Sequence, residues 1–137
     1  LNIPDCEWHG MTVNPVAVTV EKYSHIDITG CGNPNYGGGI GCYYGKLSVT
    51  DHSDVTTNQN IGSAWGIFVK ELFVDGTSKL ISCRNTGNGL DVGGKGTIEG
   101  GAEISLDGNG KRGLQVYSGS DYWYGDVEVK AGNCIGL

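Results

Sequence analysis

The sequence predicts an all-β solenoid, a chain wound into stacked coils of short strands. The first observation is a recurring tetrapeptide of glycine, an apolar residue, any residue and a second apolar residue. The second is that short runs of alternating apolar and polar residues follow its copies, a pattern typical of strands with one buried face. The third is composition, because 25 glycines among 137 residues favour many tight turns over long helices.

The tetrapeptide recurs every 23 to 29 residues. Such a period indicates coils that can bury their apolar sides only by stacking on their neighbours. We therefore predict a single domain over residues 1–137, a right-handed parallel β-helix solenoid of about five three-stranded coils that start near residues 10, 39, 66, 89 and 113. The right hand follows from the general preference of parallel strand crossovers. The copies are Gly10–Val13, Gly39–Cys42, Gly66–Val69, Gly89–Val92 and Gly113–Val116.

Each coil is expected to turn the apolar residues of its three strands toward one interior. The inward phase of residues 80–83 is open, although Ser78 favours an inward Leu80, since Ser24, Ser53 and Ala102 stand at the same distance before their inward residues. The predicted interior residues are Met11, Val13, Val18, Val20, Ile26, Ile28, Ile40, Leu47, Val49, Val55, Ile67, Val69, Leu72, Val74, Leu90, Val92, Ile98, Ile104, Leu106, Leu114, Val116, Val127 and Val129.

The two ends of the chain carry separate expectations. Residues 1–9 are predicted to cap the first coil, with Trp8 covering its exposed edge, because the end of a solenoid needs protection. We expect Asp126–Val129 to be the third strand of the fifth coil. Residues 134–137 then read as the opening of a sixth coil, so we expect the chain to be a piece of a larger protein.

Loops after the third strand vary in length, whereas the step from the second strand to the third is constant. A Gly-Asn pair recurs in the variable loops, and both residue types tolerate the left-handed backbone of a tight bend. We predict that these asparagines are structural and hydrogen-bond from coil to coil. The pairs are Gly32-Asn33, Gly87-Asn88, Gly108-Asn109 and Gly132-Asn133.

Charge and cysteine content limit the partners. A net charge of −6, with Lys111-Arg112 as the only basic pair, argues against nucleic acid, and no segment suits membrane insertion. The five cysteines lack zinc-site spacing. Cys42 takes the place of a buried valine, so we expect it to be a small buried residue. Cys6 and Cys31 flank the first coil and could pair in an oxidising compartment, which leaves their state open.

Glycine-opened coils of three short strands, with asparagines at a recurrent turn, resemble the right-handed parallel β-helix of the pectin-lyase-like superfamily. The resemblance covers the chain after about residue 10 and brings no catalytic motif. It implies a bacterial or phage protein, since proteins of this fold include polysaccharide lyases and hydrolases, phage tail spikes and autotransporter-type adhesins. Non-catalytic carbohydrate-binding and adhesin β-helices are the most similar, because their repeats are also short and glycine-rich.

A polysaccharide lyase of this fold would need a basic residue beside a calcium site built from several carboxylates. Five carboxylates fall at or beside the predicted third strands of successive coils, so some of them could form one outward column. A solvated polar face is the favoured interpretation, and a calcium site is the alternative. The segment 51–54 approaches a hydrolase pattern but lacks its flanking glycines, so we expect a turn. We predict that the protein is not an enzyme and needs no cofactor, with calcium possible. The carboxylates are Asp27, Asp54, Glu103, Asp126 and Glu128.

Aromatic residues gather around the first strand of successive coils. Phe68, Asp91 and Gln115 occupy one outward position in three coils and should form a column. Exposed aromatic patches mark binding surfaces, and sugar rings stack on them. We therefore predict an extracellular or cell-surface module that binds a polysaccharide or cell-surface glycan; the alternatives are a structural shaft segment of an adhesin or tail spike, stacked on neighbouring coils, and a piece of a polysaccharide lyase. The predicted binding residues are Tyr43, Trp65, Phe68, Asp91, Gln115, Tyr117 and Trp123.

Overall fold

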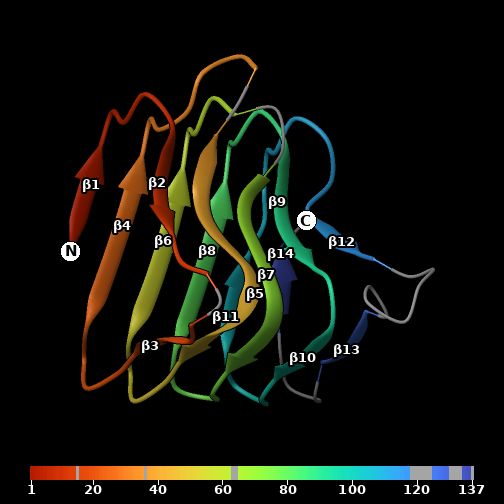
Figure 1. The fold of residues 1–137 in the computed structure, drawn as a ribbon. Coiled ribbons are helices and arrows are strands. Elements are labelled where there is room, and N and C mark those ends of the chain that lie inside the picture. Colours follow the sequence, from red (N-terminus) through yellow and green to blue (C-terminus); the bar gives the residue numbers. More distant parts are fainter. Residues whose placement is uncertain (15, 36, 63–64, 118–124, 130–133, 137) are drawn as a thin grey trace.

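The computed structural model describes residues 1–14, 16–35, 37–62, 65–117, 125–129 and 134–136. All regular secondary structure in these ranges is β-strand, and every strand pairing is parallel (Figure 1). The predicted fold class is confirmed as an all-β solenoid of parallel strands with about four turns. Its handedness and the exact number of coils stay predictions. The described residues contain no helix long and apolar enough to cross a membrane.

One sheet runs along the whole length of the solenoid and contains the third strand of each coil (Figure 1). We call it sheet A. It has six strands in the order β1-β4-β6-β8-β11-β14. Their bounds are Asn2–Pro4 (β1), His25–Thr29 (β4), Asp54–Asn58 (β6), Lys79–Cys83 (β8), Glu103–Ser105 (β11) and Cys134–Gly136 (β14).

The first and second strands of the coils make a second sheet of eight strands, which we call sheet B. In two coils the first and second strands join into one long strand that curves around the solenoid (Figure 1). The bounds in sheet B are His9–Thr12 (β2), Val18–Val20 (β3), Gly38–Val49 (β5), Trp65–Val74 (β7), Asn88–Val92 (β9), Lys95–Ile98 (β10), Leu114–Val116 (β12) and Asp126–Val129 (β13).

Strand register confirms the alignment of the five tetrapeptides. Their first apolar residues are direct partners in neighbouring strands. The pairs are Met11 with Ile40, Ile40 with Ile67, Ile67 with Leu90, and Leu90 with Leu114. Alternate side chains of each strand therefore meet the same positions of the next coil, which gives one continuous interior.

Glycine opens the tetrapeptides for a steric reason. A Cβ on Gly66 would lie 2.2 Å from the Ser82 hydroxyl oxygen, and one on Gly89 would lie 2.4 Å from the Asn109 amide nitrogen. The first strand of a coil thus packs directly against the end of its third strand, and only glycine leaves room for this contact.

The predicted interior agrees with the structure in the middle coils and weakens toward the ends. Residues from Val20 to Leu106 on the predicted list are buried, and Leu80 is buried too, which settles the inward phase of β8. Met11, Val13, Val18, Leu114 and Val127 are only partly buried. Val116 is half-buried, and Val129 is 42% exposed, so its assignment to the interior was wrong.

Three expectations about the ends are also wrong: that Trp8 covers the first coil, that residues 126–129 form a third strand, and that residues 134–137 open a further coil. Trp8 is 55% exposed and does not cover the first coil. The N-terminal residues instead add strand β1 to the edge of sheet A, beside β4. At the other end β13 pairs with β10, which makes it a second strand, and β14 pairs with β11, which makes it the third strand of the fifth coil.

Asparagines do stack from coil to coil, but most belong to different positions from those predicted. The Oδ1 atom of Asn85 accepts hydrogen bonds from both the backbone and side-chain nitrogens of Asn60, and Asn109 accepts the same pair from Asn85. Of the predicted Gly-Asn pairs, only Asn109 belongs to this stack. Asn33 and Asn88 also hydrogen-bond between coils, because Asn33 donates to the Glu7 carbonyl and Asn88 accepts from the Arg112 amide. Asn133 lies outside the described residues. Each of the stacked asparagines lies three residues after the last inward residue at the end of a third strand. Cys31 holds the equivalent position in the first coil, three residues after Ile28. We call Asn60, Asn85 and Asn109 the asparagine ladder.

Candidate functional site

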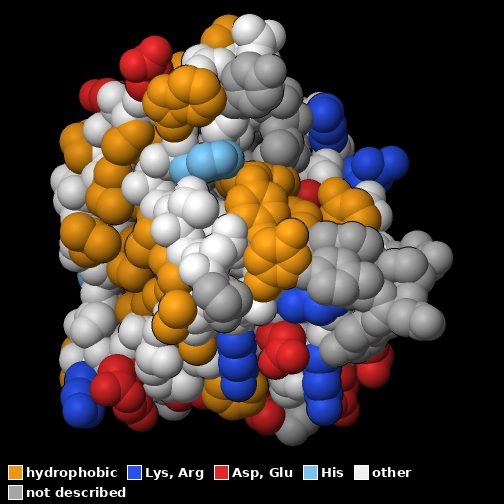
Figure 2. All heavy atoms as spheres, in the orientation of Figure 1, with side chains coloured by type: hydrophobic (Ala, Val, Ile, Leu, Met, Phe, Trp, Pro, Cys, Tyr) orange, Lys and Arg blue, Asp and Glu red, His pale blue; other side chains and the backbone are white. Residues whose placement is uncertain are grey.

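An aromatic patch lies on the outer side of sheet B, over β2, β5 and β7 (Figure 2). The rings of His9 and Trp65 stack with centroids 4.9 Å apart. Tyr43 meets Trp65 at 5.6 Å and Phe68 at 5.1 Å, and Phe68 meets Tyr117 at 5.9 Å. These five residues, the aromatic patch, thus form a chain of ring contacts that crosses successive coils.

The inner members of the patch are less exposed than predicted. Trp65 and Phe68 are 6% and 7% exposed, because each packs against rings from neighbouring strands. The accessible surface comes from the rim, where Tyr43 is half-buried and Tyr117 is 36% exposed. A ligand on this face would therefore meet the tyrosines first, with Trp65 and Phe68 supporting them from below.

The predicted column is present, although its centre is closed to solvent. Phe68 pairs in register with Asp91, and Asp91 with Gln115. Asp91 is only 1% exposed and accepts hydrogen bonds from the Asn88 amide at 2.9 Å and the Tyr117 hydroxyl at 3.1 Å. Burial raises the pKa of Asp91 to about 6, while these hydrogen bonds act in the opposite direction. Asp91 therefore fixes the Tyr117 ring at the rim of the patch.

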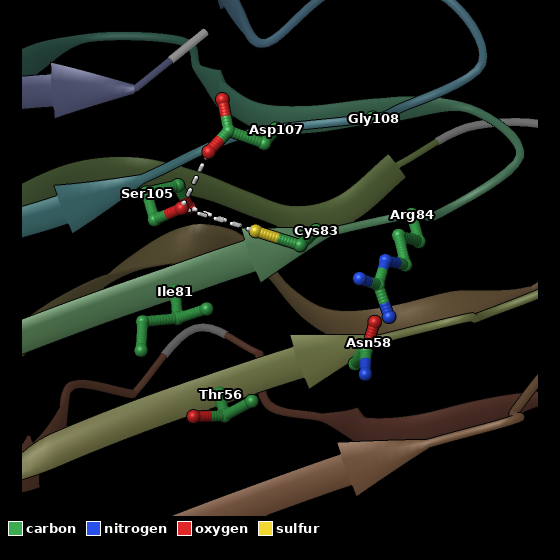
Figure 3. A pocket seen from close by; sticks show the side chains of 8 residues that line it. All are labelled: Thr56, Asn58, Ile81, Cys83, Arg84, Ser105, Asp107 and Gly108. Carbon is green, nitrogen blue, oxygen red and sulfur yellow. Dashed lines mark hydrogen bonds between the residues drawn. The ribbon is translucent and has the colours of Figure 1, made fainter.

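A polar groove of about 280 Å³ lies on the outer face of sheet A (Figure 3). Its floor is formed by outward side chains of β6, β8 and β11, and the Arg84 guanidinium lies beside the Asn58 amide oxygen. The Ser105 hydroxyl donates to the Asp107 carboxylate at 3.2 Å and lies 3.3 Å from the Cys83 thiol. The groove offers adjacent donors and acceptors but, unlike the aromatic patch, no ring surface.

The carboxylates considered for calcium do not share one column. Asp54 and Glu103 lie in one row of sheet A, separated by Lys79, whose Nζ is 2.7 Å from Glu103. Asp27 lies two positions along, and Asp126 and Glu128 belong to β13 in sheet B. Over the described part of the chain, no three His, Cys, Asp or Glu side chains come close enough to hold a metal ion. The segment 51–54 includes the predicted turn, with Asp51 and His52 both at positive φ.

Most of the predicted binding residues are brought together by the fold. Tyr43, Trp65, Phe68 and Tyr117 make the patch, and Asp91 and Gln115 lie in register with it. Trp123 lies outside the described residues. Sequence reasoning missed His9 and Asn88, although Asn88 could have been found, because it pairs in register with Trp65 one coil away.

Comparison with known proteins identified no relative of this chain. No protein-family model matches this sequence, and neither a curated protein nor a solved structure is significantly similar to it. The class of the protein, a parallel β-solenoid, therefore comes from the fold alone.

Proposed function

We propose that this protein is a non-catalytic module that binds a neutral polysaccharide or glycan outside the cell or at its surface. The observation that carries the proposal is the aromatic patch. The rings of Tyr43 and Tyr117 keep accessible surface on the outside of the solenoid, and the apolar faces of sugar rings stack well on such surface. The Tyr117 hydroxyl and the Gln115 amide at the rim supply polar groups for the edges of a sugar.

Charge selects the kind of glycan. The chain carries a net charge of −6, which repels polyanions and slows their approach. A neutral glycan meets no such barrier. On this proposal the chain is related to the non-catalytic carbohydrate-binding and adhesin members of the pectin-lyase-like superfamily, with a right-handed coil, and it requires no metal ion.

The test is a glycan array that contains neutral and acidic glycans, followed by affinity measurements on the best ligand. Tyr43→Ala addresses the rim, and this variant should keep the wild-type melting curve within a few degrees. We expect Tyr43→Ala to weaken binding about tenfold or more, because it removes one stacking surface. Tyr23→Ala is the matched control, since Tyr23 is 78% exposed but stacks on His52 away from the patch.

Three outcomes would overturn the proposal. If Arg84→Ala abolishes binding and Tyr43→Ala leaves it unchanged, the polar groove on sheet A is the site. If no glycan binds at all, the structural shaft becomes the better explanation. Release of new reducing or unsaturated ends from any glycan would show an enzyme instead.

A further inference from the structure

Cys6 and Cys31 occupy directly adjacent positions in neighbouring coils. Strand β1 pairs with β4 in parallel register, with Pro4 opposite Thr29. The pairing continues beyond the strands, because the Asp5 amide donates to the Thr29 carbonyl at 2.8 Å and the Gly32 amide donates to the Cys6 carbonyl at 2.7 Å. Cys6 therefore stands opposite Cys31, one strand spacing away, or roughly 4.8 Å.

The side chains of the two cysteines are also directed alike. Each follows a residue with positive φ, Asp5 at 51° and Gly30 at 72°, so the two turns bend the chain in the same way. The Cys6 amide donates to the Cys31 sulfur at 3.3 Å, in the same manner as the Cys31 amide donates to the Asn60 side-chain oxygen at 2.9 Å. The cysteines thus continue the asparagine ladder toward the N-terminal end of the solenoid.

We propose that Cys6 and Cys31 form a disulfide bond under oxidising conditions and so fasten strand β1 to the first coil. A separation of one strand spacing falls within the Cα distance range that disulfides span. Both cysteines are free thiols in this structure. Oxidation joins the two sulfur atoms, releases both thiol protons and passes two electrons to a low-molecular-weight disulfide, which is reduced to two thiols.

Burial determines which of the two cysteines reacts first with the small disulfide. Cys6 is partly exposed, whereas Cys31 is 0% exposed and has no room for an added group. Burial, together with hydrogen bonding to the Cys6 thiol, raises the pKa of Cys31 to about 11. Cys6 therefore exchanges first with the small disulfide, and Cys31 then displaces the small thiol from the Cys6 sulfur. The second step should become faster as pH rises, because the attacking species is the thiolate.

Cys42 and Cys83 serve as internal controls. Cys42 faces the interior beside Val69, and Cys83 contacts Ser105 in the groove on sheet A. Neither site places a second described cysteine at the opposite position, since the strand partners of Cys42 and Cys83 are Val69 and Asn58.

The experiment incubates the full chain with oxidised glutathione, labels the remaining thiols under denaturing conditions, and maps the peptides by mass spectrometry. We expect Cys6 and Cys31 to escape labelling as one cross-linked peptide pair, and the melting temperature to rise by about 5–10 °C. Cys6→Ser should remove both effects, and Cys83→Ser should remove neither. Full labelling of Cys6 and Cys31 after oxidation, a bond that involves Cys83, or a cross-link that leaves the melting temperature unchanged would each overturn the proposal.

Discussion

Asn85 is the middle rung of the asparagine ladder and shows how one buried side chain joins three coils. It accepts two hydrogen bonds from Asn60 and donates to Asn109 and to the Ser82 hydroxyl. A buried amide is tolerated here because its donors and its acceptor all have partners. The side chain therefore fixes the stacking of the turns that follow the third strands.

We expect Asn85→Ala to lower the free energy of unfolding by about 3 kcal/mol, because the backbone and side-chain nitrogens of Asn60 lose the Asn85 oxygen as acceptor, and the Asn109 oxygen keeps only the Asn85 backbone donor. Urea unfolding followed by circular dichroism measures the change. Asn35→Ala is the control, since Asn35 is exposed and lies outside the ladder. Equal effects of the two substitutions would contradict a role for the ladder in stability.

Asp91 makes the stability of the folded protein depend on pH. Burial raises its folded pKa from 3.8 to about 6, so the folded chain binds this proton more tightly than the unfolded chain. The stability it contributes is therefore complete below about pH 4 and is lost as pH rises through 6.

We expect Asp91→Asn, which stays neutral, to gain about 2 kcal/mol relative to wild type between pH 4 and pH 7. Urea unfolding of both proteins at several pH values across this interval tests the prediction. Asp107→Asn, at an exposed carboxylate, should follow the wild-type slope. Parallel curves for wild type and Asp91→Asn would show that the buried carboxyl is not the source of the pH dependence.

At the scale of the element, strand position within the stack decides how much a side chain contributes. Val74 and Val129 hold the same register position in second strands two coils apart, since Ile98 pairs with Val74 on one side and with Val129 on the other. Val74 is 0% exposed and Val129 is 42% exposed. The same residue type at the same register position is thus core in one coil and surface in another.

We predict that Val74→Ala lowers the free energy of unfolding by about 2 kcal/mol, from lost apolar burial and the cavity that remains. Val129→Ala should change it by less than about 0.5 kcal/mol. The pair is compared by chemical unfolding under identical conditions. A larger effect at Val129 would mean that β13 is packed more tightly than its exposure indicates.

At the scale of the whole molecule, the solenoid presents two outer faces of different character. The outer face of sheet B carries the aromatic patch, and the outer face of sheet A carries the polar groove and a row in which Lys79 pairs with Glu103. Stacking repeats each outward position at roughly one strand spacing, so residues far apart in sequence become a continuous surface. Both candidate binding surfaces are products of this stacking.

The sequence by itself determined the coils. Alternation of apolar residues and the glycine before each first strand are local features, and stacking repeats them, so the register from Met11 to Leu114 and the buried middle coils could be predicted. Spacing favoured an inward Leu80, because Ser78 stands where Ser53 does one coil away, but only the structure settled the phase of residues 80–83.

Only the tertiary structure decided the features that depend on contacts between coils. The segment 126–129 alternates like any strand, and its assignment as a second strand came from pairing with β10. The asparagine ladder could not be predicted from the Gly-Asn pairs. Its members are the asparagines whose side chains hydrogen-bond to the corresponding turn of the next coil, and this depends on how the coils stack. Burial of Trp65, Phe68 and Asp91 likewise depends on rings and amides from other strands, since an outward position is exposed only where no neighbouring side chain covers it.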